Sequence, residues 1–238
     1  MKTGNVKQVA AFGKLVGICN DLGASYNPSK AALTPTALAT LLEQAQQNLE
    51  AVNGARANFV LAINARQESY AGIYKLMSRV VRAVASAESS RENIRDARML
   101  RHLLAPKSTA KKSKLAAVGE TPGAAVVSIS SSRLDYDGQA DTLARMISLV
   151  QGMLAYAPNE PDLQVEGLKA LLSDLKMKSL VVANTANALA NARISRNKVL
   201  NGRGGVFETA TAVKEYIRSV FGVRSEPAKE LGKLQLAA

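Results

Sequence analysis

The feature that most constrains the fold of this chain is a similarity between its two halves. The triplet Tyr-Asn-Pro at 26–28 returns as Tyr-Ala-Pro at 156–158, which is 130 positions later. The triplet Asn-Ala-Arg at 64–66 returns at 191–193, with an offset of 127. Ordered landmarks of this kind predict a duplicated structural unit with small insertions and deletions. Chance recurrence of Leu in a chain rich in Ala and Leu is the alternative.

Helical spacing of apolar residues predicts three or four helices in each copy. The expected helices cover residues 5–22, 35–67, 73–88 and 89–104, and then 134–155, 161–200, 206–222 and a short segment after Ser225. In the longest helix of the first copy, apolar residues lie seven apart, as in a coiled-coil seam. These residues are Leu38, Ala45, Val52 and Phe59. A second row of apolar residues lies four positions further on, at Leu42, Leu49 and Ile63, and Arg56 interrupts this row.

Composition favours helices over strands. The chain has only four Phe, six Tyr and no Trp, whereas strands are enriched in aromatic and β-branched residues. We therefore predict an all-α fold, an elongated helical bundle made of two tandem pseudo-equivalent units of three to four helices. The predicted domains are residues 1–104, a flexible basic connector at 105–131, and residues 132–238.

Charge is unevenly distributed along the chain. The formal net charge is +12, of which residues 1–133 hold +10. A basic surface of this kind attracts anionic partners such as nucleic acid or acidic lipid. The first half of the chain and the connector are therefore where we expect such a partner to bind.

One helix concentrates basic residues on a single face. Arginines spaced four, three and three apart share a broad face of the helix predicted at 89–104, and a lysine run follows in the connector. The candidate anion-binding or nucleic-acid-binding residues are Arg91, Arg95, Arg98, Arg101, Lys107, Lys111, Lys112 and Lys114. Guanidinium groups donate to phosphates in pairs, and lysines add non-specific attraction. The alternatives are a solvated face that pairs with Glu88, Glu92 and Asp96, a membrane surface, or an acidic protein.

The reactive side chains are few. His102 is the only histidine, at the end of a helix where a cation is favourable, and Cys19 lies on an apolar helical stripe. A single cysteine excludes an intramolecular disulfide, and one Cys with one His does not make a structural zinc site. We therefore expect a non-enzymatic protein with no catalytic residue, no metal and no cofactor.

Three other motifs have structural interpretations. Asp135, Asp137 and Asp141 do not match the spacing of a calcium loop, and they suit the start of a helix. The stretch Asn-Gly-Arg-Gly-Gly at 201–205 lacks the Lys-Ser/Thr of a phosphate loop, so we expect a turn between helices. The Asn-Ala-Arg triplets have either equivalent helix-packing positions or a shared binding role.

Location follows from what the sequence lacks. Lysines interrupt the N-terminal apolar stretch, no cleavage site for a signal peptide follows it, and no run of 18 uncharged apolar residues occurs. We expect a cytoplasmic protein, with a membrane partner unlikely.

Four short motifs carry a family resemblance. They are Tyr-Asn-Pro-Ser-Lys at 26–30, Asn-Ala-Arg-Gln at 64–67, Tyr-Ala-Pro-Asn-Glu at 156–160 and Asn-Ala-Arg-Ile at 191–194. This pattern resembles a family of duplicated helical proteins from Bacteroidetes-type bacteria whose function is not established. The resemblance covers most of the chain and implies a bacterial origin. It brings no activity, so no functional residue follows from it.

Together these observations predict a structural or binding protein, such as a scaffold or an assembly component. A nucleic-acid-associated basic protein is the first alternative, and a membrane-active helical bundle is the second. The helix seams suggest self-association, and no small-molecule substrate is evident from the sequence.

Overall fold

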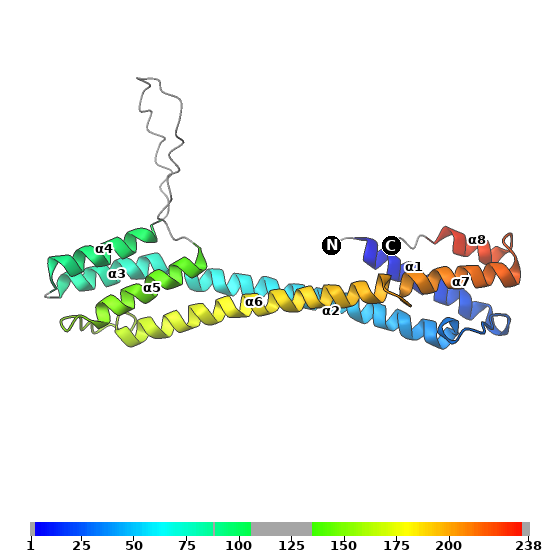
Figure 1. The fold of residues 1–238 in the computed structure, drawn as a ribbon, viewed down its shortest axis with the longest axis horizontal. Helices are drawn as coiled ribbons and strands as arrows, with labels where there is room; N and C mark the ends of the chain where they lie inside the picture. Colours follow the sequence, from blue (N-terminus) through cyan, green and yellow to red (C-terminus); the bar gives the residue numbers. More distant parts are fainter. Residues whose placement is uncertain (1–2, 88, 106–134, 235–238) are drawn as a thin grey trace, which may run out of the picture. The chain divides into compact units, whose positions relative to one another are not determined.

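The long helix predicted in each half of the sequence is present in the computed structural model, which describes residues 3–87, 89–105 and 135–234 (Figure 1). These long helices are α2 (Pro35–Tyr70) and α6 (Val165–Asn201). The shorter ones are α1 (Thr3–Asp21), α3 (Ile73–Ser86), α4 (Arg91–Leu103), α5 (Tyr136–Gln151), α7 (Val206–Phe221) and α8 (Glu226–Lys233). Two 3-10 turns lie at Gly23–Ser25 and Ala31–Leu33. Within the described residues every regular element is helical, which confirms the all-α prediction.

Serine side chains begin two of the short helices. Ser225 accepts a hydrogen bond from the backbone N–H of Ala228 at 3.4 Å and caps α8. The cap of α4 is Ser90, which accepts from the N–H of Asn93 at 3.2 Å. The helix that was predicted to begin at residue 89 therefore begins at Arg91, two residues later. Ser90 has the extended backbone that a capping residue needs, directly before the first helical residue.

The chain divides into two compact units, which we call unit 1 and unit 2. Unit 1 contains residues 1–61 together with 183–238, and unit 2 contains residues 62–182. Helix α2 contributes its first part to unit 1 and its last part to unit 2, and α6 does the reverse. Each unit thus combines helices from both of the sequence segments that were predicted as domains.

The core of unit 1 is formed by α1, the first part of α2, the end of α6, α7 and α8. Its largest fully buried side chains are Phe12, Leu15, Leu38, Leu200, Ile217 and Leu231. Each helix contributes an apolar stripe to this cluster, so removal of apolar surface from water holds the five segments together.

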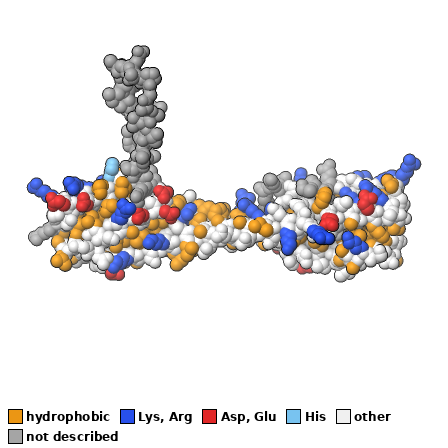
Figure 2. All heavy atoms as spheres, in the orientation of Figure 1, with side chains coloured by type: hydrophobic (Ala, Val, Ile, Leu, Met, Phe, Trp, Pro, Cys, Tyr) orange, Lys and Arg blue, Asp and Glu red, His pale blue; other side chains and the backbone are white. Residues whose placement is uncertain are grey.

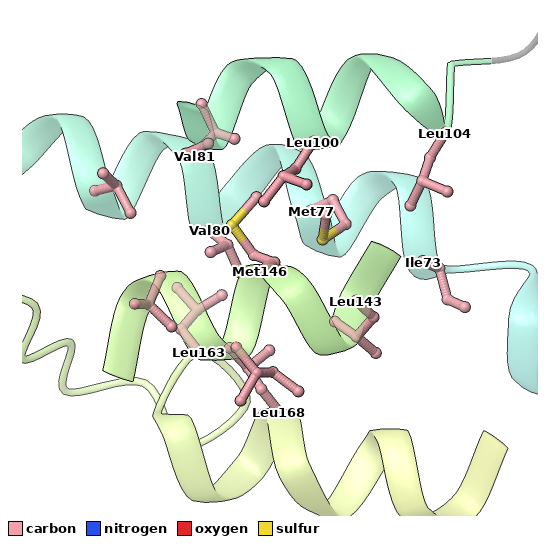
Figure 3. Close-up of a cluster of buried hydrophobic side chains, with 14 of the residues drawn as sticks. Ile73, Met77, Val80, Val81, Leu100, Leu104, Leu143, Met146, Leu163 and Leu168 are labelled. Atoms are coloured by element: carbon pink, nitrogen blue, oxygen red, sulfur yellow. The ribbon is translucent and has the colours of Figure 1, made fainter. Parts of the chain in front are cut away.

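The core of unit 2 is likewise formed by apolar side chains from several helices, part of which Figure 3 shows. It is formed by α3, α4, α5, the first part of α6 and the end of α2. Its largest fully buried side chains are Ile73, Met77, Leu143, Met146, Leu168 and Leu175. Met77 and Met146 place flexible thioether side chains in this core, which suits the filling of irregular gaps.

The seams of the long helices differ in regularity. In α6 the buried residues lie seven apart, at Leu168, Leu175, Val182 and Leu189. In α2 the repeat holds up to Val52, but Phe59 is only half-buried and Ala62 is the next buried residue. The predicted seam is therefore wrong at Phe59. At about 100° per residue, Ala62 lies about 80° around the helix from Val52, so the buried side of α2 changes beyond Val52.

The two Tyr-x-Pro loops close in the same way. The Tyr26 hydroxyl donates to the carbonyl oxygen of Leu33 at 2.8 Å in unit 1, and Tyr156 donates to Leu163 at 2.7 Å in unit 2. Both tyrosines are buried. Burial raises the pKa of Tyr156 to about 12, and it also raises the pKa of Tyr26. Each loop is therefore held by a neutral, buried hydroxyl.

Candidate functional site

Three of the four predicted arginines share the outer surface of α4, over which Figure 2 shows basic side chains. Arg91, Arg95 and Arg98 are all exposed, and we call this surface the α4 face. Its one ion pair joins Arg95 Nε to Asp96 at 3.9 Å, near the limit for such a contact. Arg91 and Arg98 form no ion pair with any residue that the structure describes. Among the described residues the alternative of a salt-bridged face therefore applies weakly to Arg95 alone, and its predicted partner Glu88 lies outside them.

Arg101 does not belong to the α4 face, because its guanidinium group binds α3. Its Nε donates to Ser78 Oγ at 2.8 Å, and a terminal nitrogen donates to the Tyr74 hydroxyl at 2.7 Å. The guanidinium carbon also lies 5.0 Å from the centre of the Tyr74 ring, within the range of a cation–π contact. Arg101 thus joins two helices of unit 2.

Arg79 of α3 is paired, whereas the lysines predicted after α4 are not described. Arg79 forms a two-pronged ion pair with Asp162, whose longer hydrogen bond measures 3.2 Å. Asp162 raises the pKa of Arg79 and offsets its charge. The predicted lysines lie outside the described residues: Lys107, Lys111, Lys112 and Lys114. Positive charge without a described partner is therefore found on the α4 face of unit 2.

The thiol and the imidazole have contrasting environments. Cys19 is fully buried in the core of unit 1, and this burial raises the pKa of its thiol to about 11. A protonated, buried thiol is a poor nucleophile. His102 is exposed in the last turn of α4, at the helix end where the sequence placed it.

The acidic cluster acts within a helix start, as its spacing predicted. Asp135 caps α5 by accepting from the N–H of Gly138 at 2.9 Å, and Asp141 pairs with Arg145 at 3.1 Å. Among the described residues, no three His, Cys, Asp or Glu side chains gather closely enough to hold a metal ion.

The glycine-rich stretch at 201–205 is a turn between α6 and α7, as predicted. The N–H of Gly205 donates to the carbonyl oxygen of Gly202 at 2.9 Å, and Gly204 donates to the Glu208 carboxylate at 2.7 Å. Gly204 has a φ of 70°, a conformation that favours glycine. The Gly204 N–H, which in a phosphate loop would bind a phosphate, thus donates to the Glu208 carboxylate of the chain itself.

The two Asn-Ala-Arg triplets place their arginines in different surroundings. In unit 2, Arg66 lies over the Tyr136 ring at 4.1 Å from its centre. The ring of Tyr136 in turn meets Tyr70 edge-on at 4.8 Å. Arg193, the arginine of the second triplet, is exposed and lines a cavity of unit 1. The expectation of equivalent packing positions is therefore wrong for these side chains.

This cavity, which we call the unit 1 cavity, has a volume of about 360 Å³. It is lined by Asn5, Val6, Leu49, Val52, Asn53, Arg56, Arg193 and Arg196. The sequence-based site included none of these residues. Two signals pointed toward them, namely the interruption of the seam at Arg56 and the second Asn-Ala-Arg triplet. What the sequence did not reveal is that these arginines, far apart in the chain, belong to one cavity.

Comparison of the chain with protein-family models, with curated proteins and with solved structures found no match. The resemblance to a helical family of Bacteroidetes-type bacteria therefore remains a prediction. None of the described helices combines the length and the apolar character that crossing a membrane requires.

Proposed function

We propose that this chain is a non-enzymatic binding protein, an assembly component that contacts a polyanion through the α4 face. The observation that supports this most directly is the exposure of Arg91, Arg95 and Arg98 with one weak ion pair among them. Arginine donors that are not used within the fold remain able to bind phosphate oxygens in pairs. Arg79 and Arg101 illustrate the opposite case, since their donors are used by the chain itself.

Nucleic acid is the polyanion that we consider first. Arg91 and Arg98 lie seven residues apart, which corresponds to about 10 Å along a helix. Duplex DNA carries one charge per about 1.7 Å of its axis, so this span meets several phosphates. Helix α4 has no Phe, Tyr or Trp on which a base could stack. We therefore propose binding to the phosphate backbone without sequence preference.

We further propose that the chain arose by duplication of one helical unit. The equal hydrogen bonds of Tyr26 and Tyr156 support this origin, as do the two cores of similar make-up. Units 1 and 2 each draw helices from both copies. A domain-swapped dimer, in which two copies exchange helices, would distribute its helices in the same way if the two copies were joined into one chain. A protein with two such units suits a role in an assembly, in which one unit binds while the other serves a second contact.

The test is binding of the full chain to duplex and single-stranded nucleic acid across a salt series. The variant exchanges Arg91, Arg95 and Arg98 for Gln, and the control exchanges Lys176, Arg203 and Arg224, which are equally exposed, for Gln. Both variants lose three positive charges. We expect the first to bind at least about tenfold more weakly, with a salt slope lower by up to about 0.9 per lost phosphate contact.

Two outcomes would contradict this proposal. Equal loss of affinity in both variants would mean that net charge, rather than the α4 face, attracts the ligand. Absence of binding at low salt would remove nucleic acid as the partner. Variants that also exchange Lys107, Lys111, Lys112 and Lys114 measure what the predicted basic connector adds.

A further inference from the structure

We propose that the unit 1 cavity is a binding site for a small phosphomonoester with an apolar body. Three guanidinium groups line it, from Arg56 of α2 and from Arg193 and Arg196 of α6. None of the residues that line the cavity is acidic. This site lies in the other unit from the α4 face and does not depend on the function proposed for that face.

The charge of Arg196 is held in place by amide groups but is not neutralised. With its amide oxygen turned toward Arg196, Asn5 accepts from Nε at 3.2 Å and from a terminal nitrogen at 3.1 Å. Asn197 accepts from the other terminal nitrogen at 2.8 Å. Amide oxygens orient a guanidinium group without cancelling its charge. Arg56 and Arg193 have no hydrogen-bond or ion-pair partner among the described residues.

In unit 2 the corresponding position beside an arginine is filled by aromatic rings of the chain itself. Tyr136 is the first residue of α5, 131 positions after Asn5 in the first turn of α1. The Tyr136 ring covers Arg66 at 4.1 Å and packs against Tyr70. In unit 1 the short amide Asn5 takes the position of Tyr136, and Asn197 takes the position of Tyr70, 127 residues after it. The cavity is thus left by two rings that unit 1 lacks.

The lining selects the chemical class of the ligand. Three arginines favour a group with two negative charges, and a phosphomonoester carries close to two at neutral pH. Guanidinium forks match its oxygens with paired, charge-assisted hydrogen bonds. Val6, Leu49 and Val52 add an apolar part to the wall, against which an aliphatic or aromatic body can pack. A volume of about 360 Å³ is within the range of small-molecule sites, and exceeds the need of a bare anion.

The experiment is calorimetric titration of the full chain with phenyl phosphate, inorganic phosphate and succinate at low salt. We expect one phenyl phosphate site per chain, with weaker binding of inorganic phosphate because it has no apolar body. Single exchanges of Arg56, Arg193 or Arg196 for Gln should each weaken phenyl phosphate at least about tenfold, since each removes hydrogen bonds to a charged group. Arg224→Gln, an exposed arginine of the same unit, is the control and should have no effect.

A second variant separates charge from space. Asn5→Tyr keeps all three arginines and places a ring where unit 2 has Tyr136. We expect it to abolish phenyl phosphate binding while the helical circular-dichroism spectrum stays unchanged. Arg196→Lys keeps the charge but loses the planar fork, and it should bind more weakly than the unaltered chain.

Three results would overturn the proposal. The first is no saturable binding of phenyl phosphate. The second is equal binding of succinate, which would remove the preference for phosphate. The third is a loss of binding in the variant of Arg91, Arg95 and Arg98 with none in the cavity variants, because the ligand would then be held by the α4 face. Since nucleic-acid binding is measured with the α4 variant, failure of one proposal leaves the other standing.

Discussion

Under the proposed duplication the helices of units 1 and 2 correspond, and the units differ most where the first turn of α1 or α5 meets an arginine of α6 or α2. In unit 2 the Tyr136 ring covers Arg66, whereas in unit 1 Asn5 binds the edge of Arg196 beside a cavity. The Tyr136 ring adds packing and a cation–π contact, while Arg66 Nε is buried without a hydrogen-bond partner among the described residues. The short side chain of Asn5 leaves the unit 1 cavity open and the charge of Arg196 uncancelled. A ligand is expected where a position in one unit is poorly packed although the corresponding position in the other unit is well packed.

Elsewhere the two units agree closely. Both tyrosine hydroxyls bind a carbonyl seven residues ahead, and Leu38 and Leu168 are both fully buried. The comparison therefore separates features that the architecture needs from those that one unit has changed. Substitutions at corresponding positions test this division, because shared features should respond equally and changed features should not.

The largest effect is expected in the shared cores. Leu38→Ala and Leu168→Ala, which lie 130 positions apart, should each lower the free energy of unfolding by about 2–5 kcal/mol through lost burial and a residual cavity. Urea unfolding followed by circular dichroism measures both losses. A loss below about 1 kcal/mol in one variant alone would mean that the two units are not packed alike.

The next effect should be unequal between the units. Tyr136→Ala removes an edge-on aromatic pair and a cation–π contact, which together contribute about 1–3 kcal/mol. Asn5→Ala removes hydrogen bonds at a partly exposed site and should cost about 1 kcal/mol or less. Thermal and urea unfolding compare the two variants. Equal destabilisation would contradict the view that only unit 2 is filled at this place.

Removal of the two loop hydroxyls should again be symmetrical. Tyr26→Phe and Tyr156→Phe each leave a carbonyl oxygen without its buried donor, at a cost of about 1–2 kcal/mol. The measurement is urea unfolding of both variants under the same conditions. A clearly larger loss in one loop would show that only that loop depends on its hydroxyl.

The same tyrosines predict how stability depends on pH. In the unfolded chain a tyrosine ionises near its ordinary pKa of 10.0, whereas Tyr156 in the fold holds its proton up to about pH 12. Between these values the unfolded state binds fewer protons, so stability should fall as pH rises. Tyr156→Phe should make this fall shallower. An unchanged pH profile in that variant would contradict the assignment.

The smallest effect should come from the ion pair of Arg79 and Asp162, which only unit 2 has. The positions that correspond at offsets of 133 and 130 are Ala212 and Ala32. Both charged groups are about half exposed, so Asp162→Asn should cost about 1 kcal/mol or less. The cost should disappear at high salt because screening removes the attraction. A loss that persists in molar salt would point to packing instead.

Helices were predictable from sequence because their signals are local. Apolar spacing, the Thr34-Pro35 start of α2 and the glycine-rich turn before α7 all act within a few residues. The start of α4 was predicted two residues early because Ser89 and Ser90 are adjacent and both are good capping residues. Phe59 was misjudged because the buried side of α2 changes beyond Val52, which a local seven-residue repeat does not reveal.

The candidate site was less predictable because its residues are brought together by folding. The α4 face lies on one helix, so its spacing could be recognised, but the contact of Arg101 with Tyr74 depends on how α3 and α4 pack. Arg56 and Arg193 come from opposite halves of the sequence. No local pattern indicates that the first part of α2 and the end of α6 belong to one unit.

The most direct test of this account is a crystal structure of the full chain grown with phenyl phosphate. The account predicts one phosphate group within hydrogen-bond distance of Arg56, Arg193 and Arg196, and none beside Arg66, where the Tyr136 ring occupies the place. A phosphate bound beside Arg66, or bound to the α4 face while the unit 1 cavity stays empty, would contradict it.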